Sequence, residues 1–405
     1  MMAGSLPGSA CRSTVTAVAV AVVALAASTA HGPDGRMELD RRALQRVERP
    51  PLGLPPVPVP TEDRPTGARI RLGRKLFFDR RLSRNGTLSC AMCHVPEQGF
   101  TVNETRTAVG FEGRVLRRNA PTLLNAAYAA PFFHDGREPD LEMQPFDVFV
   151  NPDEMAAPSL GAVVATVRSL PQYAPLFEAA FGGRPSVERI GKAIAAYVRT
   201  LLSADTPFDR WRYGGEPGAV SQAARHGFEL FAGKAHCASC HVVGESAALL
   251  TDHRFHDNGV AWYQSVVLAS SREPVEVRVA PGVTTRLPRM ALDSIGAPPV
   301  SDLGRYEVTG DPADRWRIKT PTLRNVAITA PYMHDGSFST LREVVEYYNR
   351  GAHPHDGLDP ILGPLGLEER DLDGLVALLR SFTGDNLDEL VRDARSEAVG
   401  NPGGE

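Results

Sequence analysis

The sequence predicts a mainly α-helical chain made of two tandem units of the same kind. Apolar residues recur every three or four positions in separate segments, each bounded by Pro, Gly or short polar residues. These segments are 161–170, 186–202, 221–231, 341–348 and 368–382. Strand patterns are scarce, and 275–279 is the short exception. Two patterns that each occur twice in the chain predict the tandem arrangement.

The first repeated pattern is Cys-x-x-Cys-His, and in an exported protein it is the attachment signature of c-type haem. The two thiols bond to the vinyl groups of one haem, and the adjoining imidazole is the proximal ligand of its iron. The copies lie too far apart for one shared metal site, so they predict two haems. A zinc site or a thioredoxin-like dithiol also uses Cys-x-x-Cys, but a His follows both pairs here. The haem-binding residues are Cys90, Cys93 and His94 in the first copy, and Cys237, Cys240 and His241 in the second.

The second repeated pattern is Pro-Thr-Leu-x-Asn followed by Ala-Pro-x-x-His-Asp-Gly, at 121–136 and again at 321–336. Each copy follows a Cys-x-x-Cys-His motif, which predicts a duplicated haem unit. We expect the first unit at 67–215 and the second at 216–390. Residues 244–310 are rich in Gly, Pro, Asp and Arg, and are expected to form a loop insertion in the second unit.

The chain ends have distinct compositions. Arg12, an apolar run at 15–27 and small residues at 28–30 predict a cleaved signal peptide over 1–30, and therefore export. A retained membrane anchor is the alternative, but the run is short for a bilayer span. No second apolar stretch has spanning length, so the mature chain is expected to contain no integral membrane segment. Repeated Pro residues predict an extended lead-in over 31–66, and 391–405 is expected to be a disordered tail.

The cysteine content and the net charge argue against disulfide bonds and against nucleic-acid binding. The chain has five cysteines, of which Cys11 lies in the predicted signal peptide. The others all belong to the two haem motifs, so no thiol remains for a disulfide. A formal net charge of -4 argues against nucleic acid as a partner.

Several further segments resemble the di-haem bacterial cytochrome c peroxidases and their MauG branch. They are Leu-Gly-Arg-Lys-Leu-Phe-Phe-Asp at 72–79, Asp-Gly-Arg at 135–137, Asn-Pro-Asp-Glu-Met at 151–155, Pro-Phe-Asp at 207–209 and the repeat at 320–336. The resemblance covers roughly residues 67 to 390 of the sequence. It implies two class I cytochrome c-like domains, each with one covalent c-type haem. It also implies a calcium ion between the haems, a periplasmic location and hydrogen peroxide as the oxidant.

The first haem is expected to have an open iron. A peroxidatic iron needs an empty sixth position and a distal group that moves a proton between the peroxide oxygens. Many family members have a blocking His in a stretch that here holds Phe111, and no His occurs between His94 and His134. The resemblance implies that Glu154 is the general acid–base and Gln144 the distal amide. Composition alone favours a surface or helix-capping role for Glu154, and the motif match reverses that preference.

At the second haem, the family's Met ligand position holds Tyr348. The apolar stripe of the preceding helix directs this side chain inward, whereas Tyr347 lies about 100° further round and is the weaker candidate. A phenolate favours ferric and higher oxidation states, so this haem is expected to store an oxidising equivalent. The alternative is that Tyr348 packs in the core, with Met333 or Met290 as the ligand.

The resemblance also implies the contents of the space between the haems. The side chain of Asn119 and the main-chain carbonyls of Thr329 and Pro331 are the implied calcium ligands. His134 stands at the inter-haem position where relatives have Trp, and an imidazole is harder to oxidise than an indole. Charge transfer across that position is therefore expected to be less favourable. Trp211 and Trp316 are candidates for surface relays, although the sequence favours buried packing for both.

These features predict a periplasmic peroxidase-type oxidoreductase of the MauG-like kind. Hydrogen peroxide would generate high-valent haem iron, which oxidises a residue of a periplasmic partner protein, expected to be Trp. The methanobactin-associated members are a candidate sub-branch. The first alternative is a cytochrome c peroxidase that reduces hydrogen peroxide to water with electrons from a small cytochrome or cupredoxin. The second is an electron-transfer di-haem cytochrome without enzymatic activity, which would have two six-coordinate irons.

Overall fold

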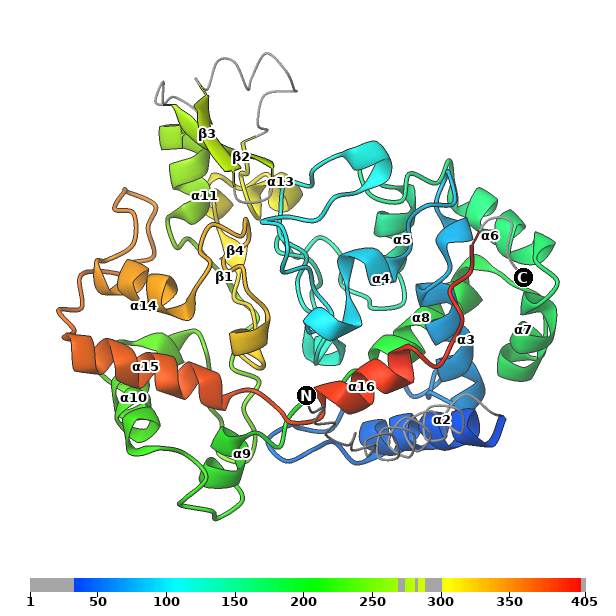
Figure 1. Ribbon diagram of the computed structural model, residues 1–405, viewed down its shortest axis with the longest axis horizontal. Helices are drawn as coiled ribbons and strands as arrows, with labels where there is room; N and C mark the ends of the chain where they lie inside the picture. Colours follow the sequence, from blue (N-terminus) through cyan, green and yellow to red (C-terminus); the bar gives the residue numbers. More distant parts are fainter. Residues whose placement is uncertain (1–32, 269–273, 281–282, 288–300, 402–405) are drawn as a thin grey trace, which may run out of the picture.

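The fold is that of a computed structural model, which describes residues 33–268, 274–280, 283–287 and 301–401 (Figure 1). Helices dominate it, as the sequence predicts. In the first half they are α2 (Pro33–Glu48), α3 (Gly67–Phe77), α4 (Cys90–Cys93), α5 (Gln144–Val150), α6 (Leu160–Ser169), α7 (Tyr173–Phe181) and α8 (Val187–Val198). In the second half they are α9 (Pro207–Arg212), α10 (Gln222–Ala232), α11 (Val260–Trp262), α13 (Tyr306–Thr309), α14 (Leu341–Asn349), α15 (Glu369–Ser381) and α16 (Leu387–Ala394).

The strands form two small antiparallel sheets in the described part of the chain. Strand β1 (Phe255–His256) pairs with β4 (Ile318–Lys319), and β2 (Val275–Ala280) pairs with β3 (Val283–Leu287). The predicted strand at 275–279 is therefore confirmed as β2. Figure 1 shows the β2–β3 hairpin projecting from the body of the molecule.

The five helices predicted from apolar spacing are confirmed as α6, α8, α10, α14 and α15. Four of them begin at a Ser or Thr whose side-chain oxygen accepts a hydrogen bond from a main-chain N–H in the first turn. These residues are Ser159, Ser186, Ser221 and Thr340. Thr340 also forms a reciprocal capping box with Glu343, which fixes the start of α14.

Each half is organised around one close helix crossing. A Cβ atom on Gly73 in α3 would lie 1.8 Å from the carbonyl oxygen of Ala193 in α8. A Cβ atom on Gly227 in α10 would lie 2.0 Å from the carbonyl oxygen of Gly374 in α15. Glycine lets the two backbones meet at both crossings. One apolar core surrounds the first crossing and another surrounds the second.

The two copies of the Pro-Thr-Leu-x-Asn repeat fold alike. Asn125 and Asn325 both adopt the left-handed conformation, with φ of 62° and 61°. The main-chain N–H of Asn125 donates to the carbonyl of Leu201 at 2.8 Å, and that of Asn325 to Phe382 at 2.9 Å. The same backbone arrangement thus recurs after each haem motif, as expected of a duplicated unit.

The chain ends differ from expectation. The lead-in predicted to be extended over 31–66 contains α2, whose Asp40 is buried and pairs with Arg74 at 2.9 Å. Only the Pro-rich part after α2 consists of turns and coil. The disordered tail predicted at 391–405 is wrong for its described residues. Helix α16 continues to Ala394, and the carbonyl of Gly400 accepts a hydrogen bond from the Arg80 N–H at 2.9 Å.

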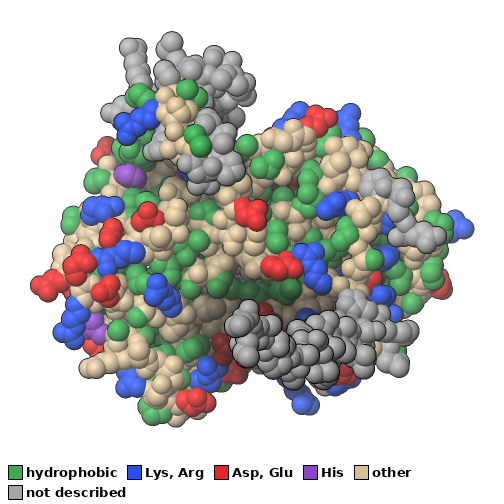
Figure 2. All heavy atoms as spheres, viewed as in Figure 1, with side chains coloured by type: hydrophobic (Ala, Val, Ile, Leu, Met, Phe, Trp, Pro, Cys, Tyr) green, Lys and Arg blue, Asp and Glu red, His purple; other side chains and the backbone are tan. Residues whose placement is uncertain are grey.

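Other predictions fall partly or wholly outside the described residues. The signal peptide predicted over 1–30 and Met290 lie there, so both stay predictions. In the described part of the 244–310 insertion, short elements interrupt the loops. None of the helices in the described ranges is long and apolar enough to cross a membrane. On the face shown in Figure 2, acidic and basic side chains are interspersed and do not gather by sign.

Candidate functional site

A cavity of about 2160 Å³ reaches both Cys-x-x-Cys-His motifs. Its lining includes Cys90, Cys93 and His94 from the first motif and Cys237, Cys240 and His241 from the second. These cysteines form no disulfides. The structure thus opens all six haem-motif side chains onto one internal space.

The two motif histidines are held in the same orientation. The Nδ1 atom of His94 lies 3.2 Å from the carbonyl oxygen of Phe100, and that of His241 lies 2.9 Å from the carbonyl of Leu250. A carbonyl only accepts, so Nδ1 carries the proton and Nε2 keeps its lone pair for a metal. Burial lowers the pKa of His94 to about 4 and also lowers that of His241, which favours neutral imidazoles. Free thiols, neutral imidazoles and the cavity size together fit two covalent haems.

Helix α14 brings Tyr348 to the cavity at the second motif. The Asn258 amide donates a hydrogen bond to the Tyr348 hydroxyl at 3.4 Å. The hydroxyl of Tyr347 points elsewhere and donates to the main-chain carbonyl of Asn258 at 2.7 Å. Met333 also lines the cavity, with its sulfur 3.8 Å from the same amide. The geometry favours Tyr348 over Tyr347 and leaves Met333 as the alternative ligand.

The corresponding helix of the first half, α5, lacks a ligand at this position. Gln144 and Val148 occupy the repeat positions of Val344 and Tyr348, and all four side chains line the cavity. Val148 has no donor atom for a metal. Phe111 packs in a separate buried cluster with Leu88 and Ala156. The two halves therefore present unequal surfaces to their cofactors.

Glu154 lines the cavity from the loop that follows α5. Its Oε2 atom is buried without a hydrogen-bond partner. Burial raises the pKa of Glu154 to about 7, although the positive charge of Arg137 acts in the opposite direction. This loop packs closely against Gly110. A Cβ atom at Gly110 would lie 1.9 Å from the carbonyl oxygen of Asp153, so a larger residue would push the loop away. A carboxyl with this pKa can accept and return a proton near neutral pH.

The residues expected to bind calcium also line the cavity, between the two motifs. The Asn119 amide nitrogen donates to the carbonyl of Arg106 at 2.8 Å, which leaves its side-chain oxygen as an acceptor. Thr329 and Pro331 contribute to the same wall. An oxygen-rich arrangement of this kind suits calcium, and these ligands stay a prediction.

His134 lies beside this wall, with its Nε2 atom 3.0 Å from the carbonyl oxygen of Asn119. Its ring centroid is 6.5 Å from that of His334, the matching residue of the second repeat. Both ring nitrogens of His334 are buried without a hydrogen-bond partner. His334 is not among the predicted site residues, although the repeated His-Asp-Gly pattern points to it. Buried polar atoms without a partner, such as these, are expected where polar groups of a bound cofactor would contact them.

Comparison with known proteins places the chain in a family. A sequence profile described as di-haem cytochrome c peroxidase matches residues 67–217. The methylamine utilization protein MauG of Methylorubrum extorquens is 36% identical over 330 residues, which cover 80% of this chain and 81% of that protein. This chain belongs to the di-haem cytochrome c peroxidase family. It is therefore a peroxidase-type oxidoreductase, and its family implies two c-type haems.

Two further similarities cover most of this di-haem peroxidase. Cytochrome-c peroxidase IdrP1 of Denitromonas iodatirespirans is 35% identical over 390 residues, covering 92% of this chain and 93% of that one. A solved structure, described as a MauG-like protein associated with microbial copper homeostasis, superposes with a TM-score of 0.69 at 28% identity. It covers 84% of this chain and 96% of the other. The relatives thus include both MauG proteins and cytochrome c peroxidases.

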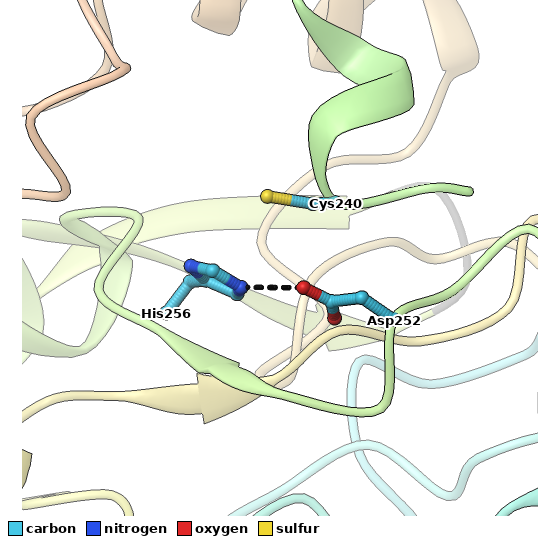
Figure 3. Close-up of side chains that lie close together, drawn as sticks. All are labelled: Cys240, Asp252 and His256. Carbon is cyan, nitrogen blue, oxygen red and sulfur yellow. Dashed lines mark hydrogen bonds and ion pairs between the residues drawn. The ribbon is translucent and has the colours of Figure 1, made fainter.

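One cluster in this di-haem peroxidase has the composition of a metal site. The ligand atoms of Cys240, Asp252 and His256 lie within 4.8 Å of one another (Figure 3). His256 is bonded to Asp252 at 2.9 Å and to Asp359 at 2.6 Å. The pKa of His256 is raised to about 10, first by its contact with Cys240 and then by these two carboxylates. A cysteine consumed by haem attachment cannot serve as a thiolate ligand, so we interpret the cluster as an ion-pair network beside the second haem motif.

Proposed function

We propose that this chain is a periplasmic MauG-like oxidase. Hydrogen peroxide would react at the first haem, and the oxidising equivalents would be used on an aromatic residue, Trp, of a partner protein. The bound haems would supply two redox-active irons. The observation that carries the proposal is the asymmetry of matching repeat positions, with Val148 in one half and Tyr348 in the other. One iron then has room for peroxide, and the other has a second ligand.

At the first site, Glu154 would act as the proton carrier and Gln144 as the distal amide. The carboxylate accepts a proton from one peroxide oxygen and returns it to the other, which leaves as water. In total, one peroxide, two electrons and two protons give two waters. The buried, unpaired oxygen of Glu154 and its pKa near 7 support this role.

At the second site, Tyr348 and His241 would hold the haem iron. Burial raises the pKa of Tyr348 to about 12, so the protein alone keeps the phenol neutral. The Tyr348 hydroxyl would have to lose its proton to bind iron, and the charge of a metal cation held there would favour that loss. The resulting phenolate is a hard anion that stabilises oxidised iron. The second haem would therefore retain an oxidising equivalent until the partner supplies an electron.

The alternative is a cytochrome c peroxidase that takes electrons from a small cytochrome or cupredoxin. Met333 favours this reading, because its thioether also lines the cavity and would raise the potential of the second haem. IdrP1 is named as such a peroxidase, whereas MauG and the MauG-like copper-homeostasis protein support the main proposal. The methanobactin-associated sub-branch is compatible with the last of these similarities.

The proposal includes the organisation predicted from the sequence. Residues 67–215 and 216–390 would be two cytochrome c-like domains with one covalent haem each, and a calcium ion would lie between them. The paired helix crossings and the twice-used backbone of the repeat support this division. Export to the periplasm would follow from the signal peptide predicted at 1–30.

Low-temperature EPR of the ferric holoprotein tests the proposal. We expect one high-spin signal from the open first haem and one low-spin signal from the second. Two low-spin signals would contradict it, because neither iron would then be open to peroxide. Rapid steady-state turnover of peroxide with reduced cytochrome c would instead favour the alternative.

A further inference from the structure

Aromatic rings in contact lead outward from Tyr348. Its ring centroid lies 5.4 Å from that of Tyr347, and the two planes meet at 71°. Tyr347 in turn lies 5.1 Å from His353, in an edge-to-face arrangement. His353 stacks on Tyr263 at 3.9 Å with an angle of 6° between the planes. Tyr263 is partly exposed, so these contacts join the cavity wall to the protein surface.

A second stack lies beside the first. Trp262, the last residue of α11, stacks on His355 at 4.5 Å with an angle of 7°. The Nδ1 atom of His355 donates to the main-chain carbonyl of His353 at 3.0 Å. The two stacks are thus joined by this hydrogen bond and by the peptide bond between Trp262 and Tyr263. Trp316 meets the edge of His355 at 5.7 Å.

The backbone holds this arrangement in place. The hydroxyl of Tyr347 donates to the carbonyl of Asn258 at 2.7 Å, next to Gly259. Gly259 has a φ of 83°, and a Cβ atom there would lie 2.9 Å from the carbonyl oxygen of His353. Glycine thus lets the segment before α11 close onto the segment after α14. The Asp257 carboxyl also lies within hydrogen-bond distance of His355 Nε2, at 2.9 Å.

The rings differ in how easily they are oxidised and in whether they can lose a proton, so their roles in electron transfer differ. Phenol and indole are among the most easily oxidised side chains, and ring contacts favour electron tunnelling. The Tyr347 hydroxyl donates to a main-chain carbonyl, which cannot take up its proton, so Tyr347 serves as a bridge. The indole of Trp262 can hold a positive charge before it loses a proton. The Asp257 carboxyl contacts the imidazole stacked on Trp262 and therefore lies close to that stack.

We infer that Tyr347, His353, Tyr263 and Trp262 form a relay that carries electrons from the surface to the second haem, and that the partner's aromatic residue docks beside Trp262 and Tyr263. This inference rests on the proposed function. In each step Trp262 loses one electron, and the peroxide-oxidised haem pair gains it. The partner's aromatic residue then returns an electron to Trp262 and releases its own proton to water. Two such steps supply the two electrons that peroxide accepts.

Trp211 lies outside this relay and provides a matched control. It packs on Phe208 at 5.8 Å and on Phe228 at 5.3 Å, within the apolar core of the second half. Its ring contacts lead through Phe208, Phe382 and Phe231 toward His241. These phenyl rings are much harder to oxidise than phenol or indole, and in the described part of the chain none of these contacts includes a ring of the relay. Of the two relay candidates named from the sequence, Trp316 thus lies at the edge of the relay and Trp211 apart from it.

The test treats the holoprotein with stoichiometric hydrogen peroxide in the absence of any partner. Without an external donor the electrons must come from the protein itself, and water supplies the oxygen added to an oxidised ring. Peptide mapping by mass spectrometry should find oxidised Trp262 and Tyr263, and freeze-quench EPR should detect an aromatic radical. The double variant Trp262→Phe with Tyr263→Phe should lose that radical, whereas Trp211→Phe should keep it.

The outcomes separate this inference from the proposed function. The Soret absorption of the same wild-type sample shows whether peroxide reacts with the haems. An absorption change accompanied by oxidation elsewhere, or by an unaltered radical in the double variant, would overturn the relay alone. No absorption change would overturn the proposed function, and the relay with it. Thermal unfolding of each variant confirms that the substitutions leave the fold intact.

Discussion

Replacing Glu154 by Gln should slow the reaction with peroxide and remove its dependence on pH near neutrality. Burial raises the pKa of this carboxyl from 4.5 to about 7, which corresponds to about 3 kcal/mol at ~1.36 kcal/mol per pKa unit. Below that pKa the group already carries a proton and cannot accept another. The wild-type rate should therefore rise with pH through about 7 and then level off.

The size of the effect follows from general acid–base catalysis. Loss of the proton carrier should lower the second-order rate constant with peroxide about 10²- to 10⁴-fold. That range corresponds to roughly 3 to 5 kcal/mol of activation free energy. Glutamine keeps the size and polarity of the side chain but cannot exchange a proton in this pH range, so the variant should have a flat profile.

Stopped-flow measurement of the haem absorption after mixing with peroxide provides the assay, at pH values on both sides of neutrality. The neighbouring Asp153 is exposed and pairs with Arg114 at 2.9 Å, so Asp153→Asn is the matched control. Its negative charge contributes to the raised pKa of Glu154, and its removal should move the inflection slightly toward lower pH. A Glu154→Gln variant with an unchanged rate and inflection would refute the role of this carboxyl.

Three further predictions follow from other parts of the molecule. Tyr348→Met should raise the reduction potential of the second haem, because a thioether favours ferrous iron; an unchanged potentiometric titration would show that Tyr348 is not a ligand. Asn119→Ala should lower the calcium content of the purified protein in elemental analysis, whereas Asn103→Ala, an exposed site, should not. Asp209→Asn leaves the buried Arg324 guanidinium without its carboxylate, and should reduce the free energy of unfolding in urea by about 3–5 kcal/mol. A loss below about 1 kcal/mol would mean that the pair behaves like an exposed one.

Short sequence patterns were sufficient to predict those elements whose structure is determined by residues close together in the chain. Helices α6, α8, α10, α14 and α15 have an apolar stripe with polar flanking residues, so their spacing alone located them. The two haem motifs and the repeated Pro-Thr-Leu-x-Asn segment likewise act through short sequences. These features were enough to predict a duplicated helical fold and the six haem-motif side chains that line its cavity.

The missed elements depend on contacts between distant segments. Helix α2 is polar along most of its length. Helix α16 has an apolar stripe at Leu387, Leu390, Val391 and Ala394, but it is short and crosses the domain end predicted at residue 390. Both are fixed by Arg74 of α3, which pairs with Asp40 at 2.9 Å and with Asp393 at 2.8 Å. A buried guanidinium is costly without its carboxylate partners, so this network forms only when all three segments are in place. No periodicity in one segment reveals such a network, and the same holds for the stacked rings around His353 and His355.

The repeat also shows how one backbone can give two unequal cofactor sites. Helices α5 and α14 both place matching residues at the cavity. A substitution at one of these positions therefore changes the side chain that would face a haem without altering the fold. Val148 and Tyr348 form such a pair, as do Gln144 and Val344. On the proposed function, the half that lacks the Tyr donor would have the polar Gln144 near its iron, and the half with Tyr348 would have the apolar Val344 there. A peroxide site needs an open iron beside a polar group, whereas a charge-storing site needs a closed iron in apolar surroundings. The same two exchanges therefore satisfy both requirements, and reversing only one of them should impair both sites.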